Sequence, residues 1–228
     1  MASASLRKSG VFILLVAALA ILLFWAARDR RVQPAGPVAL FTTLPILWAD
    51  SPDLAASLSP RAQSHWARDL LAERGAIEPL DLLTDDSLRG TRRLLMAQPR
   101  VLTPQENVEL DNWVREGGRL LLLADPALTE DSAFPLGDPR RPQAIVLLSP
   151  ILSRWGLELR FDDRQSLGRH ARDVMGVAIP VNLPGQLVTR GQDNCRLWGE
   201  GLAATCVVGK GRIVVVADAA ALERDDPS

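Results

Sequence analysis

The clearest pattern of apolar and polar positions runs from residue 94 to residue 126. Two short apolar runs, Leu94–Ala97 and Leu120–Ala124, are typical of buried strands, because a strand covered on both faces lacks polar alternation. Between the two runs, apolar residues recur at near-helical spacing, at Val108, Leu110, Trp113 and Val114. The segment therefore predicts two parallel strands joined by a helix.

The ends of this helix are also marked in the sequence. Thr103 is an N-cap candidate, Pro104 suits the first helical position, and Glu106 is placed to complete a capping box. Gly117 and Gly118 then end the helix. Units of this kind build α/β domains whose sheet is covered by helices on both faces.

Similar patterns continue on both sides of this unit. Upstream, we predict a strand at 38–43, a loop at 44–59, a helix at 60–75 whose apolar face holds Leu70, and a weak strand at 77–83. Downstream, we predict a polar loop at 129–142, a helix within 145–155, and strands at 157–161, 174–179, 195–198, 202–208 and 212–217. The order predicts a doubly wound, mostly parallel sheet with an antiparallel β extension.

An unbroken apolar run, residues 11–27, lies near the N-terminus. At about 1.5 Å per residue, a helix of this length just spans a hydrocarbon core. A cleaved signal peptide is the rival interpretation, but Phe24 and Trp25 disfavour the small-residue cleavage site that it needs. We predict an N-terminal tail at 1–10, a transmembrane anchor at 11–27, a linker at 28–36, an α/β domain at 37–222 and a C-terminal tail at 223–228.

The net charge of the chain excludes few classes of function. The chain of 228 residues has 26 Lys and Arg against 27 Asp and Glu, a net charge of −1, which gives no reason to expect a nucleic-acid partner. Basic residues flank the apolar run on both sides, at Arg7 and Lys8 and at Arg28, Arg30 and Arg31. The positive-inside rule therefore barely separates the two orientations in the membrane.

The two cysteines bear on the compartment. Cys195 and Cys206 stand symmetrically about Glu200 and Gly201, so a two-residue turn there would place them directly opposite each other. They form either a disulfide, which indicates an oxidising compartment, or two buried thiols that pack as small apolar groups. If Cys195 and Cys206 formed a hydrogen-bonded pair of the ladder, their Cα atoms would be farther apart. The sequence therefore leaves both the disulfide and the two free thiols open. If the disulfide forms, we expect the domain to lie in the periplasm and the anchor to lie in the bacterial inner membrane.

Candidate ligand positions follow from the rule that open α/β sheets bind ligands beyond the carboxyl ends of their strands. The residues at the predicted strand ends are Thr42, Thr43, Gln98, Asp125 and Asp218. Converging carboxylates there could hold Mg²⁺ or Ca²⁺. We favour the alternative that Asp125 caps the turn after its strand and that Asp218 caps a terminal helix, and we predict no metal or cofactor.

Five short motifs share the pattern of a known family. They are Pro99–Glu106, Gly117–Gly118, Leu120–Pro126, Leu152–Gly156 and Gly209–Asp218. Together they resemble the GldG-like family of ABC-type transport auxiliary proteins and related membrane-anchored domains of unknown function. The resemblance implies a fold like that of class I glutamine amidotransferases, and partners such as an ABC transporter permease or ATPase or other envelope proteins.

An amidotransferase-like reaction would need a nucleophilic Cys at a strand-to-helix elbow, with His and an acid nearby. Neither cysteine is placed at such an elbow, and His65 and His170 fall on a predicted helix and in a charged loop. We therefore predict a non-enzymatic, membrane-anchored interaction module. The alternative is a small-ligand or metal-binding sensor that uses the crevice at the strand ends.

Overall fold

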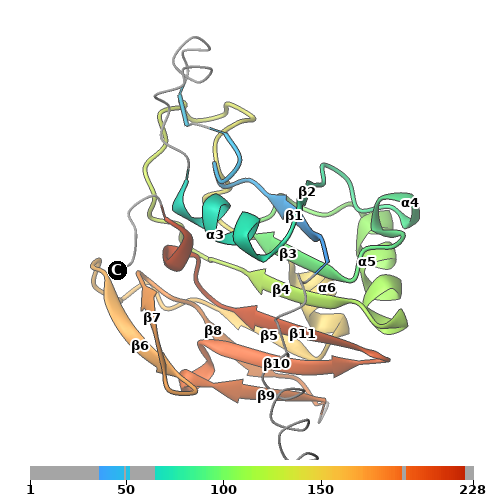
Figure 1. Cartoon of the computed structure of the whole chain (residues 1–228). Helices are drawn as coiled ribbons and strands as arrows, with labels where there is room; N and C mark the ends of the chain where they lie inside the picture. The colour runs from blue at the N-terminus through green and yellow to red at the C-terminus, as the bar shows by residue number, and fades with distance from the viewer. Residues whose placement is uncertain (1–35, 49, 52–64, 192–193, 224–228) are drawn as a thin grey trace, which may run out of the picture. The chain divides into compact units, whose positions relative to one another are not determined.

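A seven-stranded, mostly parallel sheet forms the centre of the domain (Figure 1). Its strands are β1 (Val38–Thr42), β2 (Ile77–Pro79), β3 (Arg93–Ala97), β4 (Arg119–Leu123), β9 (Cys195–Trp198), β10 (Ala203–Val208) and β11 (Gly211–Val216). In the order β2-β1-β3-β4-β11-β10-β9, the first five run parallel and the last two add antiparallel pairings. The predicted α/β sheet with its antiparallel extension is confirmed.

The computed structural model describes residues 36–48, 50–51, 65–191 and 194–223. The predicted tails and the predicted anchor at 11–27 lie outside these residues, except for the first residue of the C-terminal tail. Within the described part of the chain, no helix combines the length and apolarity needed to cross a membrane. The described residues belong to one compact unit.

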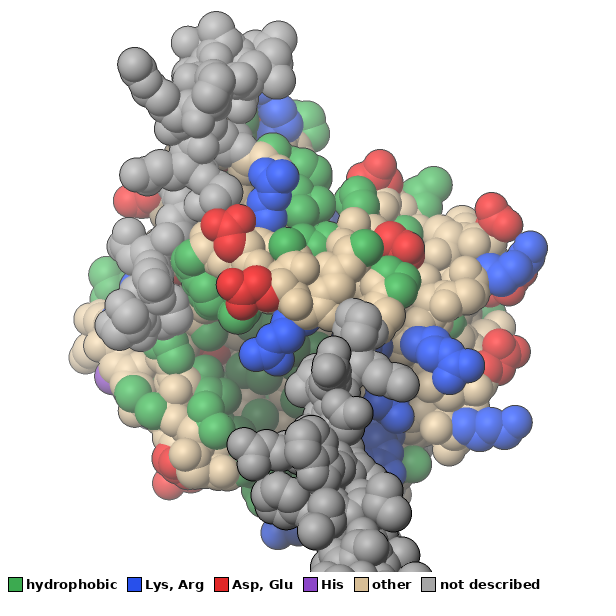
Figure 2. All heavy atoms as spheres, viewed as in Figure 1, with side chains coloured by type: hydrophobic (Ala, Val, Ile, Leu, Met, Phe, Trp, Pro, Cys, Tyr) green, Lys and Arg blue, Asp and Glu red, His purple; other side chains and the backbone are tan. Residues whose placement is uncertain are grey.

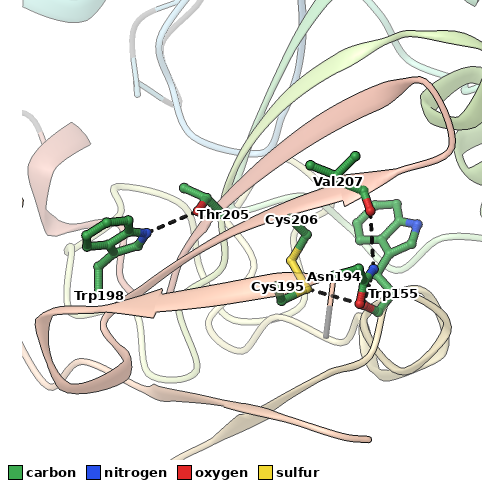
Figure 3. Close-up of a disulfide and its surroundings, with 7 residues drawn as sticks. All are labelled: Trp155, Asn194, Cys195, Trp198, Thr205, Cys206 and Val207. Carbon is green, nitrogen blue, oxygen red and sulfur yellow. Dashed lines mark hydrogen bonds between the residues drawn. A yellow bond between two sulfur atoms is a disulfide. The ribbon is translucent and has the colours of Figure 1, made fainter. Parts of the chain in front are cut away.

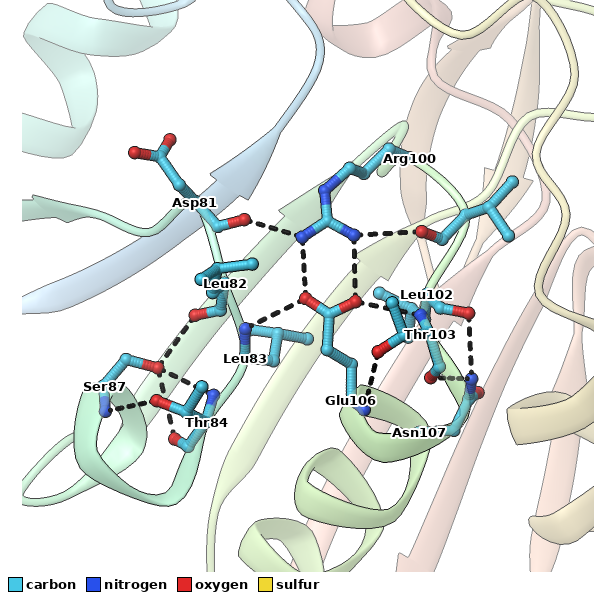
Figure 4. A network of polar contacts seen from close by, with 11 residues as sticks. Asp81, Leu82, Leu83, Thr84, Ser87, Arg100, Leu102, Thr103, Glu106 and Asn107 are labelled. Carbon is cyan, nitrogen blue, oxygen red and sulfur yellow. Dashed lines mark hydrogen bonds and ion pairs between the residues drawn. The ribbon is translucent and has the colours of Figure 1, made fainter.

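Helix α5 (Pro104–Glu116) begins with the predicted capping box. The Thr103 hydroxyl accepts from the backbone N–H of Glu106 at 3.2 Å, and the Glu106 carboxylate accepts from that of Thr103 at 2.9 Å. Arg100 binds the same carboxylate through both terminal nitrogens, and the backbone N–H of Leu83 adds a further bond (Figure 4). The Arg100 hydrogen bonds outweigh burial and lower the pKa of Glu106 to about 2. The helix start is thereby tied to the loop before α4 (Asp85–Leu88).

Helices cover both faces of the sheet, as in a doubly wound fold. On one face, here called the α3 face, lie α3 (Trp66–Arg74) and the paired strands β6 (His170–Val174) and β7 (Val177–Val181). On the other, the α5 face, lie α5, α6 (Ser149–Arg154) and the paired strands β5 (Leu157–Arg160) and β8 (Gln186–Thr189). Each face has its own buried apolar cluster.

A buried carboxylate joins α5 to α6. Asp111 is fully buried and accepts hydrogen bonds from Arg115, Arg154 and the indole N–H of Trp155, the first at 2.8 Å and the last at 3.0 Å. Burial acts to raise the pKa of Asp111, but the three donors together lower it. The sequence carries no signal for this tie, because an Asp in mid-helix reads as a solvent-facing position.

Several predicted elements differ in the structure. The helix predicted within 145–155 is confined to α6, because Pro150 fits only the first turn of a helix and so starts it. The single strand predicted at 174–179 is instead parts of β6 and β7, with a turn at Met175 and Gly176, where φ is +58° and +82°. β8 was not predicted at all.

Two apolar side chains assigned to buried helix faces are exposed. Val108 on α5 is 51% exposed and Leu70 on α3 is 44% exposed. Each helix buries only a narrow face against the sheet, through Leu110 and Val114 in α5 and Ala67 in α3. The predicted burial of Trp113, which is buried in α5 together with Leu110 and Val114, is confirmed.

Candidate functional site

The parallel registers bring the carboxyl ends of β1, β3, β4 and β11 to one edge of the sheet. All five predicted strand-end residues lie there: Thr42 at the end of β1, Thr43 after it, Gln98 after β3, Asp125 after β4 and Asp218 after β11. Gln98, Asp125 and Asp218 are buried. What these side chains bind decides whether the edge is a ligand site or a structural one.

Gln98 links three segments of the chain. Its side-chain oxygen accepts from the backbone N–H of Asp125 at 2.9 Å. Its side-chain nitrogen donates to the carbonyl oxygens of Asp125 at 3.1 Å and Gln143 at 2.7 Å. The φ of Gln98 is +43°, which is uncommon for a residue with a side chain. The amide is therefore a fixed bridge between the ends of β3 and β4 and the loop at Gln143.

The two threonines fasten the end of β1 to neighbouring backbone, and Thr43 also binds the loop at Gln143. Thr42 Oγ1 donates to the carbonyl of Ala97 at 2.7 Å and accepts from the backbone N–H of Leu44 at 2.9 Å. Thr43 Oγ1 donates to the carbonyl of Gln98 and accepts from the backbone N–H of Gln143. Both hydroxyls are thus committed to the backbone of the domain.

The carboxylates of Asp125 and Asp218 cap the turns that follow their strands. Asp125 accepts from the backbone N–H of Ala127 at 2.8 Å and of Ala219 at 3.1 Å. Asp218 accepts from that of Ala220 at 2.6 Å and of Asn182 at 3.0 Å. Each carboxylate oxygen therefore has a backbone donor. Among the described residues, no three His, Cys, Asp or Glu side chains are grouped so that they could hold a metal ion.

Because they are buried, these two carboxyl groups have pKa values close to neutral pH. Burial raises the pKa of Asp125 to about 6 and that of Asp218 to about 7, and the charge of Asp125 adds to the rise for Asp218. A third buried carboxylate, Glu223, contributes to both shifts. Glu223 itself is held by the Arg169 guanidinium and by the hydroxyl of Thr129 at 2.9 Å. Sequence reasoning missed Glu223, which it assigned to a tail.

A disulfide joins Cys195 in β9 to Cys206 in β10 (Figure 3). The two residues are register partners, and their Cα atoms are 4.1 Å apart, close to the spacing of a non-hydrogen-bonded pair. Of the two predicted alternatives, the structure has the disulfide. It packs on the α5 face, where Cys195 Sγ lies 3.4 Å from the carbonyl oxygen of Trp155.

The turn between β9 and β10 is longer than the two residues predicted. Trp198 pairs with Ala203, so the connection is residues 199–202, with a short 3-10 turn at Gly199–Gly201. Glu200 has φ +57°, and a Cβ on Gly201 would come within 2.6 Å of the Leu187 carbonyl. The predicted register survives because the longer turn has the same centre.

A second surface was not predicted. On the α3 face, Leu121 in β4 and Val214 in β11 are register partners and are 41% and 37% exposed. Thr205 in β10 pairs with Val214, and Val207, two residues on along β10, is 55% exposed. We call these four residues the open sheet face. In Figure 2, hydrophobic side chains form the floor of a hollow between α3 and the β6–β7 pair on this face.

Comparison with known proteins identifies the fold but not a family. No protein-family model matches the chain, and no curated protein matches it. Among solved structures, the mmIFT52 N-terminal domain is similar with a TM-score of 0.52 at 12% identity, over 81% of this chain and 86% of that one. At this identity, the likeness extends to the fold alone.

Two further solved structures are more distantly similar. Cytoplasmic protein STM1381 from Salmonella typhimurium LT2 has a TM-score of 0.49 at 13% identity, over 84% of this chain and 91% of that one. The exo-β-1,4-mannosidase Op5Man5 from Opitutaceae bacterium strain TAV5 has 0.46 at 17% identity, over 85% of this chain. This chain spans only 33% of the mannosidase.

Proposed function

We propose that this chain is a non-enzymatic interaction module, anchored in a bacterial inner membrane by residues 11–27. The observation that carries the proposal is the use made of the strand-end polar groups. Gln98, Asp125 and Asp218 each bind the domain's own backbone through both polar atoms of the side chain. An edge committed in this way positions loops, and the function then lies in binding at the surface.

The disulfide supports a periplasmic location for the domain. Structural disulfides persist in oxidising compartments and are rare in the cytosol. The positive-inside rule did not distinguish the two orientations, so the Cys195–Cys206 bridge is the stronger argument. The resemblance to GldG-like proteins supports an ABC-type export or envelope-assembly system as the source of the partner, and the mostly parallel sheet is compatible with the amidotransferase-like fold that it implies.

The open sheet face is the surface that we assign to the partner. Its exposed apolar side chains stand on three neighbouring strands of a hydrogen-bonded sheet, so they form a rigid strip. Exposed apolar surface of this kind marks protein–protein contacts. The side chains of Leu121 and Val214 would pack against an amphipathic helix of a membrane partner, such as an ABC permease, laid beside α3.

Anchoring is tested by alkaline carbonate extraction of the full-length protein from its native membrane. We expect the protein to stay with the membrane pellet, because the apolar run 11–27 is long enough to span it. Recovery in the soluble fraction would contradict the anchor.

The partner surface is tested by photo-crosslinking in the same membranes. A crosslinker at Val214 should give one product of defined mass that contains a membrane protein. The matched control is Leu136, a more exposed apolar residue, 87% exposed, in the loop at 129–142. Equal crosslinking from Leu136 and Val214 would contradict the assignment of the open sheet face.

A further inference from the structure

Three arginines lie side by side across the α3 face, at the edge where the parallel strands begin. Arg119 in β4 is the register partner of both Arg93 in β3 and Arg212 in β11. Neighbouring strands are about 4.8 Å apart, so the three side chains leave the sheet within about 10 Å of one another. We call these residues the arginine row. Like charges placed directly opposite destabilise a sheet unless an anion offsets them.

The arginine row lacks acidic partners within the described residues. Exposed arginines elsewhere, such as Arg140 and Arg164, each form an ion pair with an aspartate. None of the described acidic side chains forms an ion pair with Arg93, Arg119 or Arg212. One terminal nitrogen of Arg93 is buried without a hydrogen-bond partner in the described structure. A buried donor left unpaired is costly, so the anion contacts of the row are assigned to the exposed Arg119 and Arg212.

The position of the arginine row on the sheet indicates which anion it meets. Val38 precedes Ala39, the register partner of Leu94, so β1 also begins at this edge. The predicted linker 28–36 enters β1 here, and a linker of that length reaches at most about 30 Å when extended. The anchor would therefore hold this edge close to the bilayer. Figure 2 shows Lys and Arg side chains gathered on the side of the molecule where β4 and β11 begin.

We propose that the arginine row docks the domain on anionic phospholipid headgroups. The proposal rests on the membrane anchoring put forward above. Guanidinium groups bind phosphate oxygens in a bidentate manner, and basic groups near an anionic membrane surface are attracted to it. An acidic helix of a partner protein would carry the same negative charge as the lipid headgroups. Lipid is favoured because the linker brings it within reach whether or not a partner is present.

The test uses the full-length chain reconstituted into vesicles of phosphatidylcholine alone or of phosphatidylcholine mixed with phosphatidylglycerol, whose anionic surface attracts basic segments. A cysteine is introduced at Glu116, which is exposed at the end of α5 just before Arg119, and carries an environment-sensitive fluorophore. The native disulfide leaves no other free thiol. The fluorophore should become shielded from water only in the anionic vesicles. Addition of 0.5 M salt should reverse this shielding, because salt shortens the distance over which charges attract, down to ~3 Å at about 1 M.

The variant R119Q/R212Q should lower the ratio of docked to undocked protein by about 30-fold, at roughly a factor of five for each arginine. The matched control R140Q/R164Q removes the same charge from exposed positions and should leave the ratio unchanged. A response that ignores phosphatidylglycerol, or an equal loss in the control, would overturn the proposal. The proposal would also be overturned if R119Q/R212Q lost the crosslink from Val214 while the fluorophore did not respond to phosphatidylglycerol. The arginine row would then bind a protein.

Failure of the anchor would be seen separately. An unanchored chain that is recovered with anionic vesicles alone would still support the arginine row while overturning the proposed anchoring. An unanchored chain recovered with neither kind of vesicle would overturn both.

Discussion

The domain should be less stable at pH 8 than at pH 5, because two buried carboxyl groups ionise between these values. Burial raises the pKa of Asp125 from 3.8 to about 6 and that of Asp218 from 3.8 to about 7. Above about pH 4, the folded domain therefore holds more protons than the unfolded chain, whose carboxyl groups are already ionised. Stability falls with rising pH wherever the folded state binds more protons, so the loss runs through pH 6 and 7 and ends near pH 8.

The size of the effect follows from the two pKa values. Integrating the proton difference from pH 5 to pH 8 at ~1.36 kcal/mol per unit gives on the order of 1 kcal/mol for Asp125 and roughly 3 kcal/mol for Asp218. Together, the free energy of unfolding should drop by about 4 kcal/mol, a large part of the usual ~5–15 kcal/mol. Urea unfolding at pH 5, 6.5 and 8 measures this drop, with the buried Trp113 and Trp155 as fluorescence probes.

The variant Asp218→Asn separates this effect from other titrations. Its amide has a single acceptor oxygen and so cannot accept from the backbone N–H groups of both Asn182 and Ala220. The variant should therefore be less stable overall, and the diagnostic quantity is the slope of the unfolding free energy against pH. We expect more than half of the slope to disappear. Asp162→Asn is the control, because Arg164 holds the pKa of this exposed aspartate low and it stays ionised throughout. An unchanged slope in Asp218→Asn would refute the reasoning.

Three further predictions concern the core and the disulfide. Trp113→Ala should lower the free energy of unfolding by about 3–5 kcal/mol, since Trp113 is buried and its indole N–H donates to the carbonyl of Thr91; an unchanged urea midpoint would contradict it. Gly118→Ala should cost about 1–3 kcal/mol, because a Cβ there would lie 2.5 Å from the Trp113 ring, and the same denaturation assay should find this cost gone in a Trp113→Leu background. Reduction of Cys195–Cys206 should cost about 2–4 kcal/mol, and alkylation of protein taken from its native membrane should label neither thiol before reduction. Two freely labelled thiols would argue against the periplasmic location.

The sheet was predictable from sequence where local signals and burial agree. β3, β4 and α5 were found because continuous apolar runs mark strands buried on both faces, and because Thr103 and Gly117 mark the helix ends. The β6–β7 turn was missed because Met175 adopts φ +58°, a conformation that its residue type does not favour. The turn is held locally, because the Asp173 carboxylate accepts from the backbone N–H of Gly176, while the Met175 side chain is 64% exposed.

The site shows the same division between position and role. The strand-end residues followed from topology, but the role of Gln98 depends on Gln143, which is 45 residues away in sequence. The open sheet face was hidden for a related reason. Leu121 stands in an apolar run that reads as buried on both faces, and its exposure depends on how far α3 and the β6–β7 pair extend along the sheet.

The disulfide also protects the end of the sheet. β9 is the last strand and has only four residues, and the bridge ties it to β10 independently of the backbone hydrogen bonds. Without the bridge, β9 could peel away and leave the outer side of β10 unpaired. That strand, AATCVV, is six residues long, uncharged and free of proline, the composition of segments that add strands from other chains and aggregate. A chain kept in a reducing compartment would thus risk self-association as well as lower stability, and light scattering of reduced against oxidised protein would register it.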